Sequence, residues 1–401
     1  MGETTMLRIA AAMALSLFAG SIAYADMTVK VGVLTDLTGP YASLSGEGSI
    51  TAARLAAEEF EASNPGVKVD VIFGDHQNKA DIGSAIVRKW YDQGDVDAVV
   101  DITNSAVAFA VNQITRERNK VFLASGPASP DLYGKACAPT TVLWTYDTYA
   151  MSQGTGRALA KSGGSKWFFI TADYAFGHAL ERDTSRVVES EGGKVVGQVR
   201  APLNTADFSP FLLQAQSSGA NVLGLANAGL DMINAVKQAA EFGIARSGMK
   251  LAGLLVMITD VRSLGLNAAQ GLVVTEPFYW DLNPATRGWS QKFAERARGK
   301  MPSSAQAGAY SATLHYLKAV AALGSKADGA EVVRKMKAMP TSDPAFGNGM
   351  IRKDGRKLHD MFVFEVKTPG ESRSEWDLYK LVATIAPEQA FKPMGDCVAL
   401  Q

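Results

Sequence analysis

The chain has 401 residues, and its 40 lysines and arginines balance 40 aspartates and glutamates, so the formal net charge is zero. This argues against a protein that binds nucleic acid or an anionic membrane, since both need an excess of positive charge. Hydrophobic residues make up 47% and charged residues 20%, which is typical of a globular chain, and the length predicts about two to three domains.

The first 25 residues have the pattern of a secretory signal peptide. An apolar run at 9–18 follows Arg8, and the sequence A-Y-A ending at Ala25 supplies a cleavage motif. The run is about half the ~20 apolar residues that a membrane-spanning helix needs, and no later segment is long and apolar enough to span a bilayer. We expect cleavage after Ala25 and export, with Met6 as an alternative start.

The following part of the chain alternates short apolar runs with amphipathic stretches. The runs predict strands at Val29–Leu34, Val67–Phe73, Ala98–Asp101, Val121–Ala124, Trp167–Ala172, Lys194–Val199, Val222–Ala226, Leu251–Val256 and Gly271–Thr275. Their near-continuous apolar character suits strands buried on both faces. Between them, apolar residues recur at helical spacing, as at Ile50, Ala53, Ala57 and Phe60. The alternation predicts an α/β fold with parallel sheets flanked by helices.

The series is too long for one sheet of five or six strands. It pauses at 134–147 and resumes with a helix predicted over Tyr149–Ser162, so we place a lobe boundary there. Three helices and then two strands are predicted after Glu276: Thr286–Arg298, Ala305–Leu323 and Gly329–Met339, followed by Met361–Lys367 and Trp376–Ile385.

Cys137 and Cys397 are the two cysteines of the chain. In an oxidising compartment an even pair predicts a disulfide, here one that joins the middle of the chain to its end. Two unpaired, buried thiols are the alternative.

The sequence contains none of the common patterns for catalysis, metal binding or cofactor binding. The chain has no G-x-G-x-x-G after a strand, no G-x-x-x-x-G-K-[ST], no G-x-S-x-G and no H-E-x-x-H. His76, His178, His315 and His359 are scattered, and we interpret the pairs Asp75-His76 and His359-Asp360 as solvated surface groups. We therefore expect a protein that is not an enzyme and that holds neither a metal nor a cofactor.

Ligands of open parallel sheets bind beyond the carboxyl ends of the strands. The relevant loops follow Leu34, Asp101, Ala124, Ala172, Ala226 and Val256. Distinctive motifs lie in or near them: V-L-T-D-L-T-G-P-Y-A at 33–42, G-D-H-Q-N-K-A at 74–80, D-A-V-V-D-I-T-N-S-A-V-A at 97–108, S-G-P-A-S-P-D-L at 125–132, T-A-D-Y-A-F-G at 171–177 and T-A-D-F-S-P-F-L at 205–212. In this order and spacing they resemble the branched-chain amino-acid-binding family of periplasmic proteins that serve ABC importers, over essentially the whole mature chain.

The resemblance implies a type I periplasmic binding fold, with two Rossmann-like lobes, three hinge crossovers and a ligand enclosed by lobe closure. The crossovers are expected near Tyr146, 276–278 and 345–349. The lobes would then comprise residues 26–146 with 278–346 and residues 147–277 with 347–401. The resemblance also implies a periplasmic location, an ABC permease in the inner membrane as the partner, and closure as the mechanism. We expect a monomer that binds no nucleic acid.

Carried onto this sequence, the family's carboxylate-binding position falls on Ser105, at the start of a helix. Free backbone N–H groups and a hydroxyl at a helix start favour an anion, although a plain N-cap serine is the alternative. Backbone contacts fall on Gly126 and Ala128, where Ala128 replaces the threonine usual in the family. Tyr41 lies in the first loop, near the cleft.

In the second lobe, the family's aromatic wall matches Phe176, with Tyr174 nearby. An aromatic face can cover an apolar ligand, and a core aromatic at a helix start is the alternative. Ala228 and Gly229 stand where relatives carry tyrosine, which leaves room for a larger ligand. Leu255 stands where amino-acid-binding relatives place the glutamate that pairs with the ligand's ammonium group.

The missing glutamate bears on the ligand. Burying an ammonium group without a carboxylate partner costs several kcal/mol, and each ~1.4 kcal/mol is tenfold in affinity. Free amino acids are therefore disfavoured unless Asp173, Glu276 or Asp260 replaces the glutamate. We expect a small carboxylate with an aromatic or hydrophobic body. A hydrophobic or branched-chain amino-acid-binding protein and a ligand sensor of the same fold stay open as alternatives.

Overall fold

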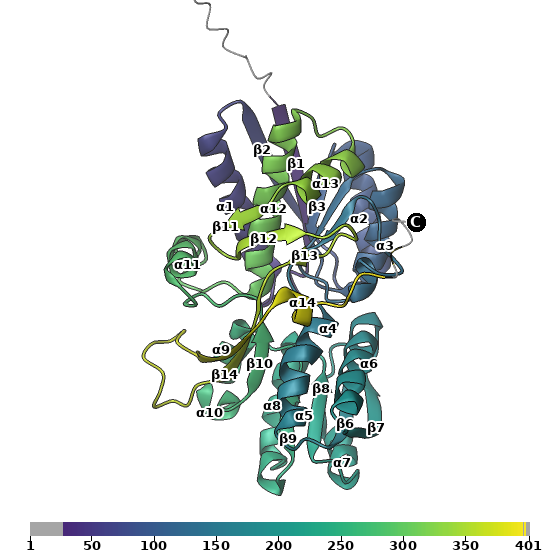
Figure 1. Ribbon diagram of the computed structural model, residues 1–401, viewed down its shortest axis with the longest axis vertical. Coiled ribbons are helices and arrows are strands. Elements are labelled where there is room, and N and C mark those ends of the chain that lie inside the picture. Colours follow the sequence, from purple (N-terminus) through teal and green to yellow (C-terminus); the bar gives the residue numbers. More distant parts are fainter. Residues whose placement is uncertain (1–26, 396, 398–401) are drawn as a thin grey trace, which may run out of the picture.

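The computed structural model has two lobes stacked along its longest axis (Figure 1). It describes residues 27–395 and 397, so the predicted signal peptide lies outside the described residues. No helix in the described part of the chain has the length and apolar character needed to cross a membrane.

The first lobe is built on a parallel five-stranded sheet in the order β2-β1-β3-β4-β5. The strands are β1 (Met27–Thr35), β2 (Val67–Asp75), β3 (Ala98–Asp101), β4 (Val121–Ala124) and β5 (Thr141–Leu143). One face packs against α1 (Gly46–Ser63), α11 (Pro284–Arg296), α12 (Ser304–Leu323) and α13 (Gly329–Ala338). The other face packs against α2 (Ala80–Gln93) and α3 (Ser105–Glu117). The central strands are therefore buried on both faces, as their apolar runs predict.

The second lobe repeats this plan with a parallel sheet in the order β7-β6-β8-β9. Its strands are β6 (Lys166–Ala172), β7 (Lys194–Ala201), β8 (Val222–Ala226) and β9 (Lys250–Gly253). Its helical elements are α4 (Thr148–Met151), the π-helical turn η2 (Ser152–Gly156), α5 (Arg157–Lys161), α6 (Ala175–Ser190), α7 (Ser209–Ser217), α8 (Gly229–Glu241), η3 (Ala245–Ser247), α9 (Ile258–Leu264) and α10 (Leu266–Ala269). Apolar side chains of the sheet enter two separate cores, one on each face.

Two antiparallel sheets complete the molecule. The first pairs β10 (Val273–Glu276), β14 (Met361–Val366) and β15 (Tyr379–Ile385), and α14 (Pro387–Ala390) follows it where the lobes meet (Figure 1). The second pairs β11 (Thr341–Asp343), β12 (Gly347–Ile351) and β13 (Lys357–Leu358). The strand expected at 271–275 thus does not extend the parallel series, because it pairs antiparallel with β14.

The third passage between the lobes differs from the expected one at 345–349. Residues 347–358 contain β12 and β13, and because β12 pairs with β11 and β13 pairs with β12, both strands stay with the first lobe. The buried Arg356 anchors them, since its guanidinium donates to the carbonyl oxygens of Leu143 (3.0 Å) and Thr145 (3.0 Å). The chain enters the second lobe at β14, so the expected boundary after residue 346 is wrong. The expected boundaries near residues 146 and 277 stay a prediction.

A disulfide joins Cys137 to Cys397, with the two Cα atoms 5.4 Å apart. Cys137 follows the short 3₁₀ helix η1 (Pro130–Leu132) of the first lobe. Nearby, Arg352 donates from Nη1 to the carbonyl oxygen of Lys392 at 2.9 Å. The end of the chain therefore returns to the first lobe after β15.

Candidate functional site

A small cavity lies between the lobes, where the carboxyl ends of the strands in both parallel sheets meet. Its wall consists of residues from the loops after β1, β3, β4, β5, β6, β8 and β9 and from the first turn of α6: Tyr41, Leu44, Thr103, Gly126, Ala128, Tyr146, Tyr174, Phe176, Ala228 and Leu255. Its room for water-sized molecules is about 10 Å³, close to what a single water needs, whereas ligand pockets are typically about 300–1,000 Å³. The lobes are therefore closed tightly here, and the cavity must widen to admit a ligand larger than a water molecule.

Seven of the nine ligand-contact residues predicted from the sequence line this cavity: Tyr41, Gly126, Ala128, Tyr174, Phe176, Ala228 and Leu255. Two do not, namely Ser105 and Gly229. Whether any of them contacts a ligand stays a prediction.

Ser105 begins α3 and is fully buried, and its hydroxyl has no hydrogen-bond partner among the described residues. The interpretation of Ser105 as a plain N-cap is wrong. The side chain of Asn104 caps the helix instead, by accepting from the backbone N–H groups of Ala106 (2.9 Å) and Val107 (3.2 Å). Thr103, just before the cap, reaches the cavity wall.

Gly229 contributes to the contact between the lobes rather than to the wall. It starts α8 with a φ of +60°, and a Cβ atom there would lie 2.3 Å from the carbonyl oxygen of Pro40. The next residue, Leu230, donates its N–H to that same oxygen at 3.0 Å. Glycine is needed here because it permits both the left-handed backbone and the close approach.

Tyrosine hydroxyls link the two sides of the cavity. The hydroxyl oxygens of Tyr41 and Tyr174, from opposite lobes, lie 2.5 Å apart. Burial raises the pKa of both side chains well above the usual value near 10, so both stay protonated and neutral. Tyr146 donates its hydroxyl to the carbonyl oxygen of Gly126 at 2.9 Å. The rings of Tyr174 and Phe176, with centroids 5.8 Å apart, form the aromatic part of the wall.

The cavity wall contains no acidic side chain. Asp173 is half-exposed, and its Oδ1 lies 2.9 Å from Nε2 of His178. Glu276 is buried and accepts from the Ser304 hydroxyl at 2.5 Å, and Asp260 is buried and accepts from the N–H of Met257 at 3.0 Å. None of the three acids that were considered as ammonium partners lines the cavity.

Burial also controls the ionisation of these two buried acids. It raises the pKa of Asp260 to about 7 and the pKa of Glu276 to about 8. Neither group is therefore a firmly ionised carboxylate at neutral pH.

The histidines of the two Asp–His pairs are not solvated, contrary to the interpretation from the sequence. His76 and His359 are both buried. Burial lowers the pKa of His76 to about 4, and its Nδ1 accepts from the N–H of Asn78 at 3.0 Å, so the ring is neutral. Within residues 27–395 and 397, no group of three or more His, Cys, Asp or Glu residues could hold a metal ion.

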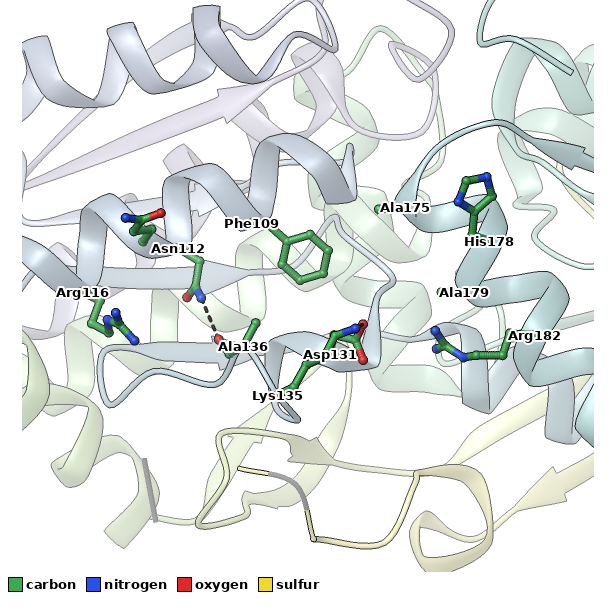
Figure 2. Close-up of a pocket in the computed structure, with 11 residues that line it drawn as sticks. Phe109, Asn112, Arg116, Asp131, Lys135, Ala136, Ala175, His178, Ala179 and Arg182 are labelled. Atoms are coloured by element: carbon green, nitrogen blue, oxygen red, sulfur yellow. Dashed lines mark hydrogen bonds and ion pairs between the residues drawn. The ribbon is translucent and has the colours of Figure 1, made fainter. Parts of the chain in front are cut away.

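A second, wider hollow also lies between the lobes, with α3 of the first lobe on one side and α6 of the second on the other. Figure 2 shows Phe109 near its middle, with α3 residues on one side and α6 residues on the other. The space is about 580 Å³ and opens to solvent. Its charges are partly satisfied, since Lys135 pairs with Asp131 at 3.0 Å and Arg182 bonds to Asp183 at 3.0 Å. None of the ligand-contact residues predicted from the sequence lines this hollow, so the cavity at the strand ends is the stronger candidate for the binding site.

Three wall residues were missed when individual contacts were chosen from the sequence: Leu44, Thr103 and Tyr146. Leu44 and Thr103 lie in loops that the strand-end rule selects. The sequence placed Tyr146 near the cleft or the hinge but did not identify it as a ligand contact. Residue numbers alone could not show which side chains of these loops face inward, because Asp101 and Ile102 turn the chain with φ values of +83° and +64°.

Comparisons with known proteins agree with this geometry. The sequence pattern of a family described as periplasmic binding protein matches residues 28–372. A periplasmic binding protein from Burkholderia mallei is 48% identical, with a TM-score of 0.90, and the match covers 94% of this chain and 100% of that one. A branched chain amino acid ABC transporter periplasmic ligand-binding protein from Burkholderia xenovorans is 37% identical, with a TM-score of 0.80 and coverage of 91% and 97%.

A solute binding protein of an ABC transporter from Rhodopseudomonas palustris, in complex with 4-hydroxybenzoate, shares the fold with a TM-score of 0.81. It is 21% identical, and the match covers 93% of this chain and 100% of that one. The family match, the two lobes and their parallel sheets lead to one conclusion: this chain belongs to the periplasmic binding protein family and has its type I fold.

Proposed function

We propose that this chain is the periplasmic substrate-binding protein of an ABC importer of the branched-chain amino-acid type, and that it closes its lobes around a small carboxylate with an aromatic or hydrophobic body. Family membership supports the importer role. In this proposal the signal peptide is cut after Ala25, and the protein acts as a monomer with an ABC permease in the inner membrane. It catalyses no reaction and needs no cofactor.

The observation that carries the ligand class is the composition of the cavity wall, which has four aromatic side chains and no acidic one. Aromatic faces favour an apolar or aromatic ligand body. An ammonium group enclosed here would lose its hydration without gaining a carboxylate partner, which costs several kcal/mol. Leu255, at the position of the family's glutamate, offers it only an apolar contact. The Rhodopseudomonas palustris complex with 4-hydroxybenzoate is an example of an aromatic acid held by this fold.

The start of α3 is where we place the ligand's carboxylate. A helix N-terminus carries a partial positive charge and attracts anions. Thr103 in the wall precedes this helix, and the buried Ser105 hydroxyl in its first turn is without a partner among the described residues. The apolar body of the ligand would then point toward the rings of Tyr174 and Phe176.

A hydrophobic amino acid is the second candidate, because the Burkholderia xenovorans relative is described as a branched chain amino acid transporter protein. This candidate requires an acid to reach the ligand's ammonium group. Glu276 or Asp260 would have to move into the wall, and both are held by hydrogen bonds elsewhere.

The test is a thermal-shift screen with ligand pairs that differ by the ammonium group alone. Suitable pairs are 3-phenylpropanoate with phenylalanine and 4-methylpentanoate with leucine, and benzoate extends the series to a smaller acid. A ligand at 100 times its dissociation constant adds about 2.7 kcal/mol to the unfolding free energy. We expect stabilisation by the acids and not by the amino acids. The reverse order would support the second candidate.

A further inference from the structure

We propose that Asp101 is a proton site linked to ligand binding: a carboxylate ligand occupies the inter-lobe cavity with Asp101 neutral, so the protein takes up a proton on binding wherever Asp101 was ionised beforehand. The inference rests on the proposed function, because it requires an anionic ligand. It assigns a positioning and pH-dependent role to a residue that does not itself line the cavity.

Asp101 lies directly behind the part of the wall where the carboxylate is placed. It ends β3 and is fully buried. Its carbonyl oxygen accepts from the N–H of Gly126 at 3.3 Å, and a Cβ atom on Gly126 would lie 2.5 Å from its Oδ1 and 2.8 Å from the backbone nitrogen of Thr103. Gly126 and Thr103 are both wall residues. The backbone of Gly126 and Thr103 therefore separates the Asp101 carboxyl from the cavity.

The backbone at Asp101 is strained, and the strain lies between β3 and the start of α3. Asp101 and Ile102 have φ values of +83° and +64°. Positive φ is uncommon outside glycine and is a genuine outlier for a β-branched residue such as isoleucine. Strained residues of this kind gather at ligand sites, where the surrounding structure holds them in place. Here they place the Asp101 carboxyl behind Gly126 while the chain turns to bring Thr103 into the wall.

No ion pair joins Asp101 to a lysine, arginine or histidine in the described part of the chain. The groups around its carboxyl are the hydroxyls of Thr35, Ser45 and Ser49, contributed by the end of β1 and by α1 with its lead-in. These hydroxyls lower its pKa, but burial outweighs them and raises the pKa to about 7. A carboxyl without a cation is free to change its charge near neutral pH.

The remaining titratable groups that face Asp101 do not compensate for a negative charge on it. Asp36, in the loop after β1, is a second acid and raises the pKa of Asp101 further. Asp36 is itself held by the N–H groups of Gly39 (2.7 Å) and Tyr41 (2.8 Å). Tyr146, in the loop after β5, also faces Asp101. Burial raises the pKa of its hydroxyl well above the usual value, so Tyr146 stays protonated and neutral.

A ligand carboxylate at Thr103 and Gly126 would bring a second negative charge close to this site. Like charges within a few ångströms in a poorly hydrated interior disfavour double ionisation, as in paired carboxylates that share a proton. A neutral Asp101 removes the repulsion. A chain of hydroxyls extends from its surroundings to the wall, since Thr35 and Ser45 hydroxyl oxygens lie 2.9 Å apart and Ser45 lies 3.5 Å from the Thr103 hydroxyl.

The sign of the pH dependence follows from this arrangement. Below about pH 7 Asp101 is neutral in the free protein, so the dissociation constant should not change with pH. Above about pH 7 Asp101 is ionised in the free protein and must take up a proton when the ligand binds. The dissociation constant should therefore rise by up to about tenfold per pH unit. The rise ends where the ligand-bound protein loses the same proton.

The first experiment uses the unmodified mature protein and two probes, benzoate and 3-phenylpropanoate, whose carboxylates stay ionised from pH 6 to 9. Titration calorimetry at pH 8 is repeated in phosphate and in Tris, which differ in ionisation enthalpy. The difference in binding heat should correspond to an uptake approaching one proton. Binding without proton uptake overturns the role of Asp101 and leaves the proposed function intact. Failure of both probes and of the other acids in the screen to bind removes the proposed function and this inference with it.

The second experiment compares two variants over pH 6–9. Asp101→Asn should bind with a dissociation constant that varies less than twofold, while the unmodified protein weakens at least tenfold between pH 7 and pH 9. Asp260→Asn is the matched control, because burial also raises the pKa of Asp260 to about 7 but this residue lies in α9 of the second lobe and not behind Gly126 and Thr103. It should keep the slope of the unmodified protein. Equal slopes in the unmodified protein and Asp101→Asn contradict the inference, and if that variant does not fold, the buffer comparison still decides.

Discussion

Replacing Gly229 with alanine tests how the lobes meet. The new Cβ atom would lie 2.3 Å from the Pro40 carbonyl oxygen and 2.9 Å from the Tyr41 ring, closer than such contacts occur. The two lobes could then not close fully, and the hydrogen bond from the Leu230 N–H to the Pro40 carbonyl oxygen would lengthen or break.

The Gly229→Ala substitution has two energetic costs: one affects the open and the closed form alike, and the other affects the closed form alone. The left-handed backbone at Gly229 costs alanine about 1–2 kcal/mol in the open and the closed form alike, so it lowers stability and not affinity. The clash and the lost hydrogen bond, worth about 0.5–1.5 kcal/mol by itself, act in the closed form alone. We therefore expect Gly229→Ala to weaken ligand binding by about 1–3 kcal/mol, or about 5- to 150-fold.

The assay is titration calorimetry with the acid that binds most tightly in the screen, together with small-angle scattering of the ligand-bound form. Gly219→Ala is the matched control, because Gly219 also has a positive φ (+72°) but a Cβ atom there meets nothing within 4 Å. It should lower the melting temperature and leave affinity unchanged. An affinity of Gly229→Ala within twofold of the unmodified protein would refute the inferred lobe contact.

Four further changes have defined outcomes. Leu255→Glu should weaken binding of 3-phenylpropanoate at least tenfold and raise the affinity for phenylalanine, as measured by calorimetry; indifference would remove Leu255 from the ligand's surroundings. Tyr174→Phe removes the hydroxyl contact with Tyr41 and should weaken binding by about 0.5–1.5 kcal/mol, and no change would mean that this contact does not favour closure. Burial raises the pKa of Glu276 from 4.5 to about 8, so the folded state holds this proton more tightly and stability should fall as pH rises through that window. Glu276→Gln should flatten that fall in thermal melts from pH 5 to 8, and an unchanged slope would contradict the assignment. Cys397→Ser should lower the unfolding free energy by about 2–5 kcal/mol in denaturant titrations and leave affinity unchanged, because neither cysteine lines the cavity.

The parallel sheets could be predicted from the sequence because their strands carry strong local signals. Ala98–Asp101, Val121–Ala124 and Val222–Ala226 are strands with the predicted bounds. β5, at Thr141–Leu143, was missed because three residues are too short to show a period, and they follow a stretch rich in turn residues. The antiparallel pairing of β10 depends on β14, which lies far away in the sequence.

The expected third passage between the lobes, at 345–349, came from the family resemblance, and the structure places the passage later in the chain. The segment 347–358 is rich in glycine and charged residues, a composition typical of an exposed connection. In the structure Arg356 and Lys357 are fully buried instead. Their burial depends on partners such as the Leu143 and Thr145 carbonyl groups and the ring of Phe346, 4.5 Å from the Lys357 ammonium nitrogen. Such partners are not visible along the sequence.

The site was predictable at the level of loops, since the carboxyl ends of parallel strands meet at one edge of each sheet. Individual side chains were less predictable. Ser105 begins α3 but does not line the cavity. Asn104 is the N-cap of this helix, and the strained turn at Asp101 and Ile102 brings Thr103 into the wall instead. Gly229 has a role that exists only when the two lobes are in contact.

The central claim is that the cavity accepts a carboxylate and rejects an ammonium group. Calorimetric titration of the mature protein with 3-phenylpropanoate and with phenylalanine tests it most directly, because these ligands share a ring and a carboxylate and differ in the ammonium group. We predict that 3-phenylpropanoate binds at least tenfold more tightly, since the wall contains no acidic side chain. Tighter binding of phenylalanine would contradict the claim and would require an acid that moves into the wall when the ligand binds.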